Sequence, residues 1–376
     1  MKNKTTKTIL SLILCVLLVI PFFQITLAST DKGISREEQM LAEMTLHEKV
    51  CQMFIVFPSD ITRVYPVTAA GEITKKALSE YPVGGILYDE SNMKSSEQLK
   101  DMVEKSQSFS KIPMFIACDE EGGRVTRIQK ILGGTDIQSM YSYKDQGAEV
   151  AGKNAANISD NLKKHGFNMD FAPVADVWSN PNNKVIGNRA YSDDFDQAAT
   201  LVAGAVKGFS ENKIVCTIKH FPGHGNTLAD SHHESVFINK SLAELKKEEL
   251  QPFQAGIDAG ADMVMLGHLI VSQVDERPIL LSEKWIKNIL RGEMGFKGIV
   301  VTDSLKMDAI SKVYGNDEVV VSAIKSGVDI LLCPSDFKSA INAVESAVEK
   351  GEISEESIND SVKRILKTKI NKGIIK

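Results

Sequence analysis

The amino-acid sequence predicts an α/β protein built as a single (β/α)8 barrel of the TIM type. Short apolar runs alternate with stretches that carry helix-start signals, and polar side chains follow several of the runs. Runs that are apolar on both sides are typical of parallel strands covered by helices on both faces. The expected strands are residues 52–57, 85–88, 113–119, 169–177, 215–221, 263–269, 298–303 and 329–333. An open, doubly wound sheet is the alternative architecture.

Helix-start signals occupy the segments between these runs. Thr45, Ser95 and Ser241 each precede a Glu or Gln by three residues, which is the spacing of a capping box. Apolar residues between 242 and 257 share one helical face, and residues 354–372 have the spacing of a closing helix. Composition changes little after the first residues, so we expect one barrel domain over residues 29–376.

The first 28 residues have the layout of a secretory signal peptide. Lys2, Lys4 and Lys7 precede an apolar run at 9–20, and small residues end the segment at Ala28. An uncleaved membrane anchor is the alternative. We therefore expect a secreted or cell-surface protein, attached to a membrane only if the leader is retained.

Charge and cysteine content narrow the classes of function. Removal of the leader takes three lysines and no acids, which changes the formal net charge from −5 to −8. An acidic chain without a Lys/Arg cluster is not expected to bind nucleic acid. Four cysteines remain, and those at 118, 216 and 333 lie inside apolar runs. Buried free thiols are expected there, with disulfides as the alternative in an exported protein.

Polar residues at the ends of apolar runs mark a candidate site. They are Asp119, Lys219 with His220, His268 and Asp303. In a TIM barrel the carboxyl ends of the strands meet at one rim, where the chemistry gathers. Asp89 also ends a run, but Glu90 and Ser91 follow it, which predicts an ordinary turn.

A loop after the fifth run adds a carboxylate and an imidazole. Pro and Gly residues at 222, 223 and 225 cannot continue a strand comfortably, so the chain enters a loop that carries Asp230 and His232. An imidazole beside a carboxylate can act as acid and then as base near neutral pH. A loop-stabilising turn is the alternative reading of this pair.

Asp303 also has two interpretations. It is either the N-cap of the following helix or a nucleophile that points into the barrel mouth. A single aspartate on a strand and an Asp–His pair on a loop suit double displacement at an acetal carbon.

A metal site is a competing interpretation of the same loop. His220, His224, His232 and His233 lie close in sequence, with Asp230 among them, and could supply zinc ligands. Their spacing matches no familiar ligand pattern, so we expect neither a metal nor a cofactor. The chain also has no phosphate-binding glycine loop and no serine nucleophile elbow.

The sequence resembles the β-N-acetylglucosaminidases of glycoside hydrolase family 3, in the subgroup that acts on GlcNAc derived from peptidoglycan. The resemblance covers residues 36–372. It rests on Asp-Glu-Glu-Gly-Gly-Arg-Val-Thr-Arg at 119–127, Ile-Gly-Asn-Arg-Ala-Tyr at 186–191, Lys-His-Phe-Pro-Gly-His-Gly at 219–225, Asp-Ser-His at 230–232 and Val-Thr-Asp at 301–303.

The resemblance implies a role for each matched residue. Asp303 corresponds to the nucleophile, His232 to the acid/base and Asp230 to the group that orients it. The residues implied to bind the sugar are Asp119, Arg127, Arg189, Lys219 and His220. Arg124 and His268 are weaker candidates, and Arg124 is expected to face solvent.

The implied activity is retaining, metal-independent exo-hydrolysis. A monomer is expected to remove terminal GlcNAc from cell-wall fragments such as GlcNAc–MurNAc, and from chitin oligosaccharides. Phosphorolysis at the same site, which releases GlcNAc-1-phosphate, is one alternative. A non-catalytic glycan-binding barrel and a metal-dependent hydrolase are the others.

Overall fold

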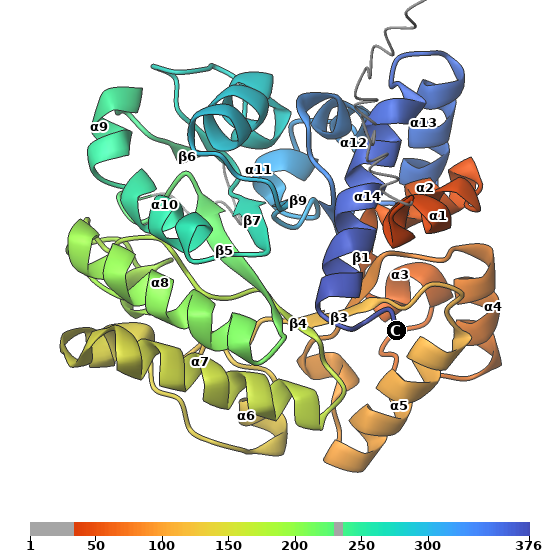
Figure 1. Ribbon diagram of the computed structural model, residues 1–376, viewed down its shortest axis with the longest axis horizontal. Helices are drawn as coiled ribbons and strands as arrows, with labels where there is room; N and C mark the ends of the chain where they lie inside the picture. The colour runs from red at the N-terminus through yellow and green to blue at the C-terminus, as the bar shows by residue number, and fades with distance from the viewer. Residues whose placement is uncertain (1–33, 229–235) are drawn as a thin grey trace, which may run out of the picture. The chain divides into compact units, whose positions relative to one another are not determined.

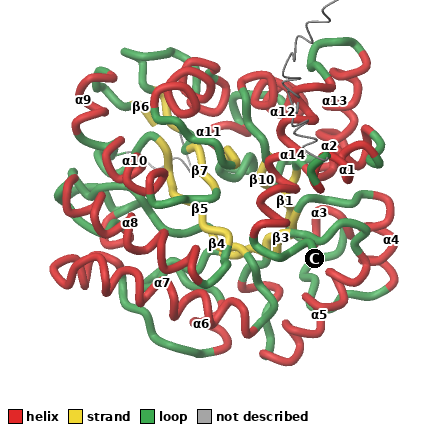
Figure 2. Tube along the Cα trace, in the orientation of Figure 1, coloured by secondary structure: helices red, strands yellow, loops and turns green. Residues whose placement is uncertain are grey.

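The computed structural model describes residues 34–228 and 236–376, and the barrel forms within residues 36–376. Eight short parallel strands line its centre, and helices surround them (Figures 1 and 2). The strands are β1 (Phe54–Val56), β2 (Gly85–Leu87), β3 (Phe115–Cys118), β4 (Met169–Asp170), β5 (Val215–Phe221), β7 (Met263–Leu266), β9 (Ile299–Thr302) and β10 (Leu331–Leu332).

The strands follow one another around the barrel in chain order. The hydrogen-bonded order is β10-β1-β2-β3-β4-β5-β7-β9. A parallel bridge between Val301 in β9 and Ile330, just before β10, joins the two ends. Each of the eight predicted runs supplies one strand, so the predicted (β/α)8 barrel is confirmed.

Several strands are shorter than the apolar runs that predict them. β4 covers only Met169–Asp170 of the expected 169–177. Pro173 follows, and because proline has no N–H it cannot continue a central ladder. The chain touches β5 once more through an isolated bridge between Val174 and Lys219. The rest of the expected run, residues 171–177, therefore lies beyond the carboxyl end of β4.

Helices pack around the barrel. They are α1 (Arg36–Ala42), α2 (Leu46–Gln52), α3 (Pro58–Thr62), α4 (Glu72–Glu80), α5 (Ser96–Phe109), α6 (Ile128–Leu132), α7 (Gly147–Lys164), α8 (Phe195–Glu211), α9 (Leu242–Lys247), α10 (Leu250–Asp258), α11 (Asp308–Ser311), α12 (Asn316–Ser326), α13 (Phe337–Glu349) and α14 (Glu355–Asn371). The described residues also form 3-10 helices, which are η1 (Glu90–Asn92), η2 (Met140–Gln146), η3 (Gly187–Arg189) and η4 (Ile279–Leu281). A π-helix, η5, covers Lys284–Glu293.

The predicted capping boxes form at two of the three positions. Thr45 and Ser241 each accept a hydrogen bond from the backbone N–H of the third helical residue. The Glu at that third position accepts a hydrogen bond from the backbone N–H of the capping residue in return. Ser95 accepts from the Gln98 N–H, but the Gln98 side chain accepts from the Lys94 N–H instead. The closing helix is also present, as α14 with Ser354 at its N-cap.

The apolar face expected over 242–257 is split between two helices. α9 ends near Glu248, whose backbone lies at φ −129° and ψ −101°, and α10 starts at Leu250. Pro252 explains the break, because proline is tolerated in the first turn of a helix but not in its interior. Periodicity alone did not show this interruption.

The structure adds a small parallel ladder that the sequence did not predict. β6 (Val236–Phe237) pairs with β8 (Leu269–Ile270), so the segments after β5 and after β7 lie side by side. The four cysteines of the described chain are all buried and free, as expected. Across residues 34–228 and 236–376, no helix combines the length and the apolar character needed to cross a membrane. The expected leader lies outside the described residues.

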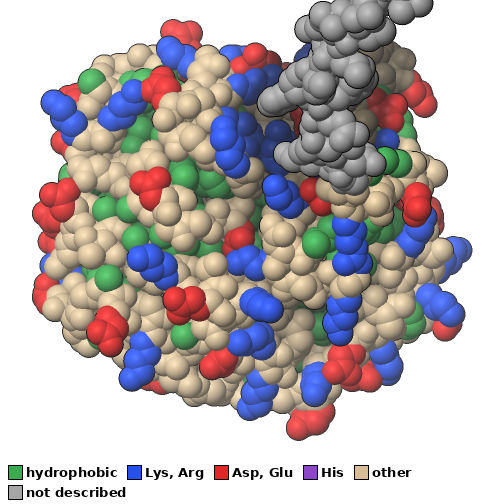
Figure 3. Space-filling view, viewed as in Figure 1, with side chains coloured by type: hydrophobic (Ala, Val, Ile, Leu, Met, Phe, Trp, Pro, Cys, Tyr) green, Lys and Arg blue, Asp and Glu red, His purple; other side chains and the backbone are tan. Residues whose placement is uncertain are grey.

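Positive and negative side chains are interspersed over much of the face shown in Figure 3. Many form exposed pairs, such as Lys105 with Asp101 at 2.7 Å and Lys287 with Glu283 at 3.0 Å. Exposed pairs of this kind contribute about 0–1 kcal/mol each. The fold therefore depends mainly on its apolar core and on a few buried charges.

One buried charge lies at the amino-terminal ends of the strands. Lys369 of α14 is fully buried, and its Nζ lies 2.8 Å from Gln52 Oε1 and 4.9 Å from the centre of the Phe115 ring. Burial lowers the pKa of Lys369 to about 7.

The Lys369 pKa predicts a pH-dependent stability. In the unfolded chain the lysine titrates near pH ~10.4, so between pH ~7 and ~10 the unfolded state binds more protons and folding becomes more favourable as pH rises. Relative to Lys369→Met, the wild-type free energy of unfolding should increase by up to about 1.4 kcal/mol per pH unit in that window. Urea unfolding at several pH values measures it. Lys367→Met, an exposed lysine on the same helix, is the control, and parallel curves for wild type and Lys369→Met contradict the prediction.

Candidate active site

The polar residues at the strand ends meet at the carboxyl-terminal mouth of the barrel. Asp119 follows β3, Lys219 and His220 belong to the end of β5, and Asp303 follows β9. In the order of the sheet β3 and β9 are four strands apart in either direction. Asp119 and Asp303 therefore follow strands on opposite sides of the barrel mouth.

A fully buried lysine links β5 to the loop after β3. Lys219 is 2% exposed, and its Nζ lies 2.8 Å from Asp119 Oδ1 and 2.7 Å from Glu121 Oε1. Burial by itself lowers the pKa of Lys219, but Asp119 and Glu121 outweigh that effect and raise it. The lysine is thus held as a cation at the base of the mouth.

Glu121 joins this lysine to Arg189. The arginine donates through Nε and Nη2 to the two Glu121 oxygens, each at 2.8 Å, in a bidentate pair. Its Nη1 donates to the Val185 carbonyl. Burial opposes ionisation of Glu121, yet Arg189 and Lys219 together hold the pKa of that carboxyl well below its usual range. Glu121 was not among the predicted site residues, although it lies inside the 119–127 motif.

Glu120 performs a third and separate task. Its buried carboxylate accepts hydrogen bonds from the backbone N–H groups of Arg127 (2.6 Å), Ile128 (2.9 Å) and Gln129 (2.9 Å) at the start of α6. Its own N–H donates to Asp170 Oδ1 at 3.0 Å. Burial raises the pKa of Glu120. These contacts fix the backbone that carries Arg127.

Asp176 organises the histidines at the end of β5. This buried carboxylate lies 2.7 Å from His220 Nδ1 and accepts from the backbone N–H groups of His220 (3.2 Å) and His224 (2.6 Å). A carboxylate only accepts, so His220 carries a proton on Nδ1 and its Nε2 is left to face other groups. Burial opposes ionisation of Asp176, but the charge of His220 lowers its pKa overall. Asp176 was not among the predicted site residues, because no spacing signal marks it.

Asp303 is half-buried and lies among imidazoles. Burial raises its pKa, but His220, His268, the Ser304 N–H and Lys219 outweigh this effect, and the pKa is lowered. Ser304 N–H donates to Asp303 Oδ1 at 2.7 Å, and His268 Nε2 lies 2.8 Å from the Ser304 carbonyl. The next helix, α11, has Met307 as its N-cap, so Asp303 is not the cap that one interpretation expected.

Arg127 lies between two carboxylates at the rim. Its Nη2 is 3.9 Å from Asp119 Oδ2, and its Nη1 is 3.5 Å from Glu90 Oε1. Asp89 caps the short turn η1, as the predicted turn requires, but Glu90 within that turn reaches Arg127. Arg124 is exposed, as expected, and donates to the carbonyls of residues 184, 185 and 186.

The predicted acid/base pair lies outside the described residues, as does His233. Of the four imidazoles in the metal interpretation, His220 and His224 are described, with ring centroids 6.2 Å apart. Among residues 34–228 and 236–376, no three His, Cys, Asp or Glu side chains are grouped as a metal site would need. The functions of Asp230 and His232 stay predictions.

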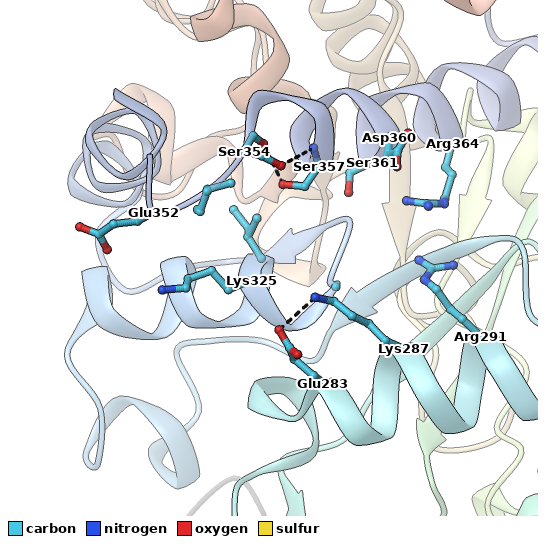
Figure 4. Close-up of a pocket in the computed structure, with 13 residues that line it drawn as sticks. Glu283, Lys287, Arg291, Lys325, Glu352, Ser354, Ser357, Asp360, Ser361 and Arg364 are labelled. Atoms are coloured by element: carbon cyan, nitrogen blue, oxygen red, sulfur yellow. Dashed lines mark hydrogen bonds and ion pairs between the residues drawn. The ribbon is translucent and has the colours of Figure 1, made fainter. Parts of the chain in front are cut away.

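A charged cavity of about 400 Å³ lies elsewhere, between η5, α12 and the start of α14 (Figure 4). Arg291 and Arg364 point toward each other at one end of it, and both bind the buried Asp329, at 2.5 and 2.9 Å. Lys287 pairs with Glu283. Arg291 also donates to the Gly298 carbonyl just before β9, so this end of the cavity lies at the amino-terminal ends of the strands, away from the mouth that holds the candidate active site.

Comparison with known proteins gives the family of this chain. Residues 45–368 match the glycosyl hydrolase family 3 N terminal domain. The chain is 35% identical over 270 residues to a beta-hexosaminidase of Stenotrophomonas maltophilia, covering 70% of this chain and 80% of that protein. It is 31% identical over 342 residues to beta-hexosaminidase A of Pseudoalteromonas piscicida, covering 83% and 57%.

Solved structures of the same family have a similar fold. A family 3 beta-N-acetylglucosaminidase from Paenibacillus sp. superposes with a TM-score of 0.83 at 37% identity, over 88% of this chain and 63% of that one. LpqI of M. tuberculosis superposes with a TM-score of 0.80 at 27% identity, over 90% and 97%. The chain thus spans less than two thirds of the Paenibacillus enzyme but nearly all of LpqI. Taken with the strand-end carboxylates, the match over residues 45–368 shows that this chain belongs to glycoside hydrolase family 3.

Proposed function

We propose that this protein is a retaining exo-β-N-acetylglucosaminidase. The observation that carries the proposal is the position of Asp303, a half-buried carboxylate with a lowered pKa that follows a strand on the opposite side of the barrel mouth from Asp119. A carboxylate nucleophile must be ionised to attack, and the imidazoles around Asp303 favour that state. The beta-hexosaminidase relatives support an N-acetylhexosamine as the sugar.

In the first step, Asp303 attacks the anomeric carbon. A covalent glycosyl–aspartate bond forms as the bond to the leaving oxygen breaks, and the imidazolium of His232 gives that oxygen a proton. In the second step, His232 takes a proton from water, and the water oxygen displaces Asp303 from the same carbon. Two inversions leave the configuration unchanged. Asp230 would keep His232 in the orientation and charge state that this exchange requires.

The other residues of the mouth hold the sugar. Asp119 accepts hydrogen bonds from hydroxyl groups, and Arg127 donates to them. His220 and Lys219 lie at the same end of the barrel as Asp303, close enough to lower its pKa. We propose that they bind the same sugar ring that Asp303 attacks. Arg189 donates to both Glu121 oxygens and to the Val185 carbonyl, and its remaining N–H groups are proposed to bind the sugar.

The proposed substrates are peptidoglycan fragments that end in GlcNAc, such as GlcNAc–MurNAc, and also chitin oligosaccharides. Residues 1–28 read as an export signal, and an exported enzyme would meet both classes of glycan outside the cell. We propose that the enzyme acts there as a monomer.

Asp303→Ala should reduce kcat/KM on an aryl β-GlcNAc glycoside at least ~10³-fold, because the glycosyl–enzyme bond cannot form. Added azide should restore turnover by attacking the anomeric carbon directly, which yields the α-glycosyl azide by a single inversion. Rates and product configuration by NMR measure both effects. Asp308→Ala, in the following helix, is the matched control. Near-normal hydrolysis by Asp303→Ala would remove the nucleophile from this mechanism.

His232→Ala should slow glycosides with poor leaving groups far more than activated ones, because only the former need protonation. Comparison of a disaccharide with a dinitrophenyl glycoside measures the difference. His233→Ala provides the neighbouring control and should behave like wild type. Equal losses on both substrates argue against an acid role for His232.

Digestion of purified muropeptides tests the substrate class. Mass analysis should show loss of a single terminal GlcNAc from GlcNAc–MurNAc species, with free GlcNAc as the sugar product in the presence or absence of phosphate. Cleavage of chitobiose with intact muropeptides would reject the cell-wall substrate, and GlcNAc-1-phosphate would show phosphorolysis instead of hydrolysis.

A further inference from the structure

Charged side chains of alternating sign form a continuous chain from the rim to the core, which we term the charge chain. Its members in order are Lys130, Glu90, Arg127, Asp119, Lys219, Glu121 and Arg189. The successive contacts are 2.9, 3.5, 3.9, 2.8, 2.7 and 2.8 Å. The longest contact, between Arg127 and Asp119, lies at the mouth of the barrel.

The spacing of that contact suits a hydroxyl group. At 3.9 Å, Arg127 Nη2 and Asp119 Oδ2 are too far apart for a direct hydrogen bond. A hydroxyl oxygen placed about 2.8 Å from each fits between them, accepting from the guanidinium and donating to the carboxylate. The other Asp119 oxygen is occupied by Lys219. The gap therefore offers one donor and one acceptor to one hydroxyl.

Glu90 accounts for the gap staying open. An arginine beside a free carboxylate closes into a charge-assisted hydrogen bond of about 2.8 Å. Here Glu90 attracts the opposite nitrogen of Arg127, and Lys130 holds both Glu90 oxygens, at 2.9 and 3.0 Å. The Arg127 backbone N–H is held by Glu120. Its side chain lies between the carboxylates of Glu90 and Asp119, which attract it in opposite directions.

The position of the gap identifies the hydroxyl, given the proposed function. Asp119 lies across the barrel from Asp303. In a pyranose ring, C4 is opposite the anomeric carbon, so a sugar with its anomeric carbon on Asp303 directs its 4-hydroxyl toward Asp119 and Arg127. That hydroxyl is equatorial in GlcNAc and axial in GalNAc.

We propose that Glu90 is a positioning residue that holds Arg127 for the sugar 4-hydroxyl and thereby sets the preference for GlcNAc over its 4-epimer. Glu90 acts through Arg127 and does not touch the sugar. A site built to hydrogen-bond one hydroxyl discriminates strongly against substrates that lack it or misplace it.

Glu90→Gln tests the proposal, because it keeps the side-chain size and removes the charge. On the aryl β-GlcNAc glycoside its kcat/KM should fall about tenfold, mostly through KM, which corresponds to one weakened charge-assisted hydrogen bond. On the 4-deoxy analogue and on the aryl β-GalNAc glycoside, wild type and variant should agree within about twofold, because neither presents the hydroxyl to the gap. The GlcNAc/GalNAc preference should shrink accordingly.

Two variants serve as controls. Glu345→Gln removes a half-buried ion pair with His47, far along the chain on α13, and should change no kinetic constant. Lys105→Ala removes an exposed ion pair with Asp101 on α5, outside the charge chain, and should change kcat/KM by less than about twofold. Equal losses for Glu90→Gln on all three glycosides, or no loss on any, overturn the proposal. A wild-type protein that hydrolyses none of the three would reject the proposed function itself.

Discussion

The mouth of this barrel depends on one constraint, the pairing of a lysine that β5 buries completely. An unpaired charge in that position would cost several kcal/mol, so Lys219 must be surrounded by carboxylates that belong to other segments. Asp119 and Glu121 meet this requirement from the loop after β3, and Arg189 balances Glu121 from the loop after β4. Three successive segments of the rim are thereby tied together. The orientation of Asp119 toward the mouth follows from that arrangement.

Other carboxylates support the same rim from buried positions. Glu120 holds the start of α6, and Asp176 holds the backbone and the ring of His220. In the sequence, residues 119–121 are three acids in a row, yet the structure directs them to the mouth, to a helix and to a buried ion pair. A site held in this way needs little rearrangement when charge develops on a substrate. Within the charge chain, the 3.9 Å contact between Arg127 and Asp119 is the longest.

Much of the fold was predictable because a parallel strand buried on both faces reads as a continuous apolar run. All eight runs became strands, and two of three capping boxes formed as predicted. The lengths were less predictable. β4 stops at Asp170 before Pro173, and Pro252 divides the helix expected over 242–257, because a missing N–H matters only once the hydrogen-bond partners are known. The β6–β8 ladder is a tertiary contact between two loops, which no local pattern announces.

The sequence by itself determined the barrel, the rim on which chemistry gathers, and the residues that end the strands. This was possible because all strands of a parallel barrel run in the same direction, so the residues that follow them lie at the same end of the barrel. Only the tertiary structure decided which side chains support them. Glu121 and Asp176 are ordinary acids in the sequence, and Glu90 belongs to a predicted turn, but folding brings each of them against a basic side chain from a distant segment. The physical reason is that charge pairing depends on distance in space, and sequence separation carries no information about it.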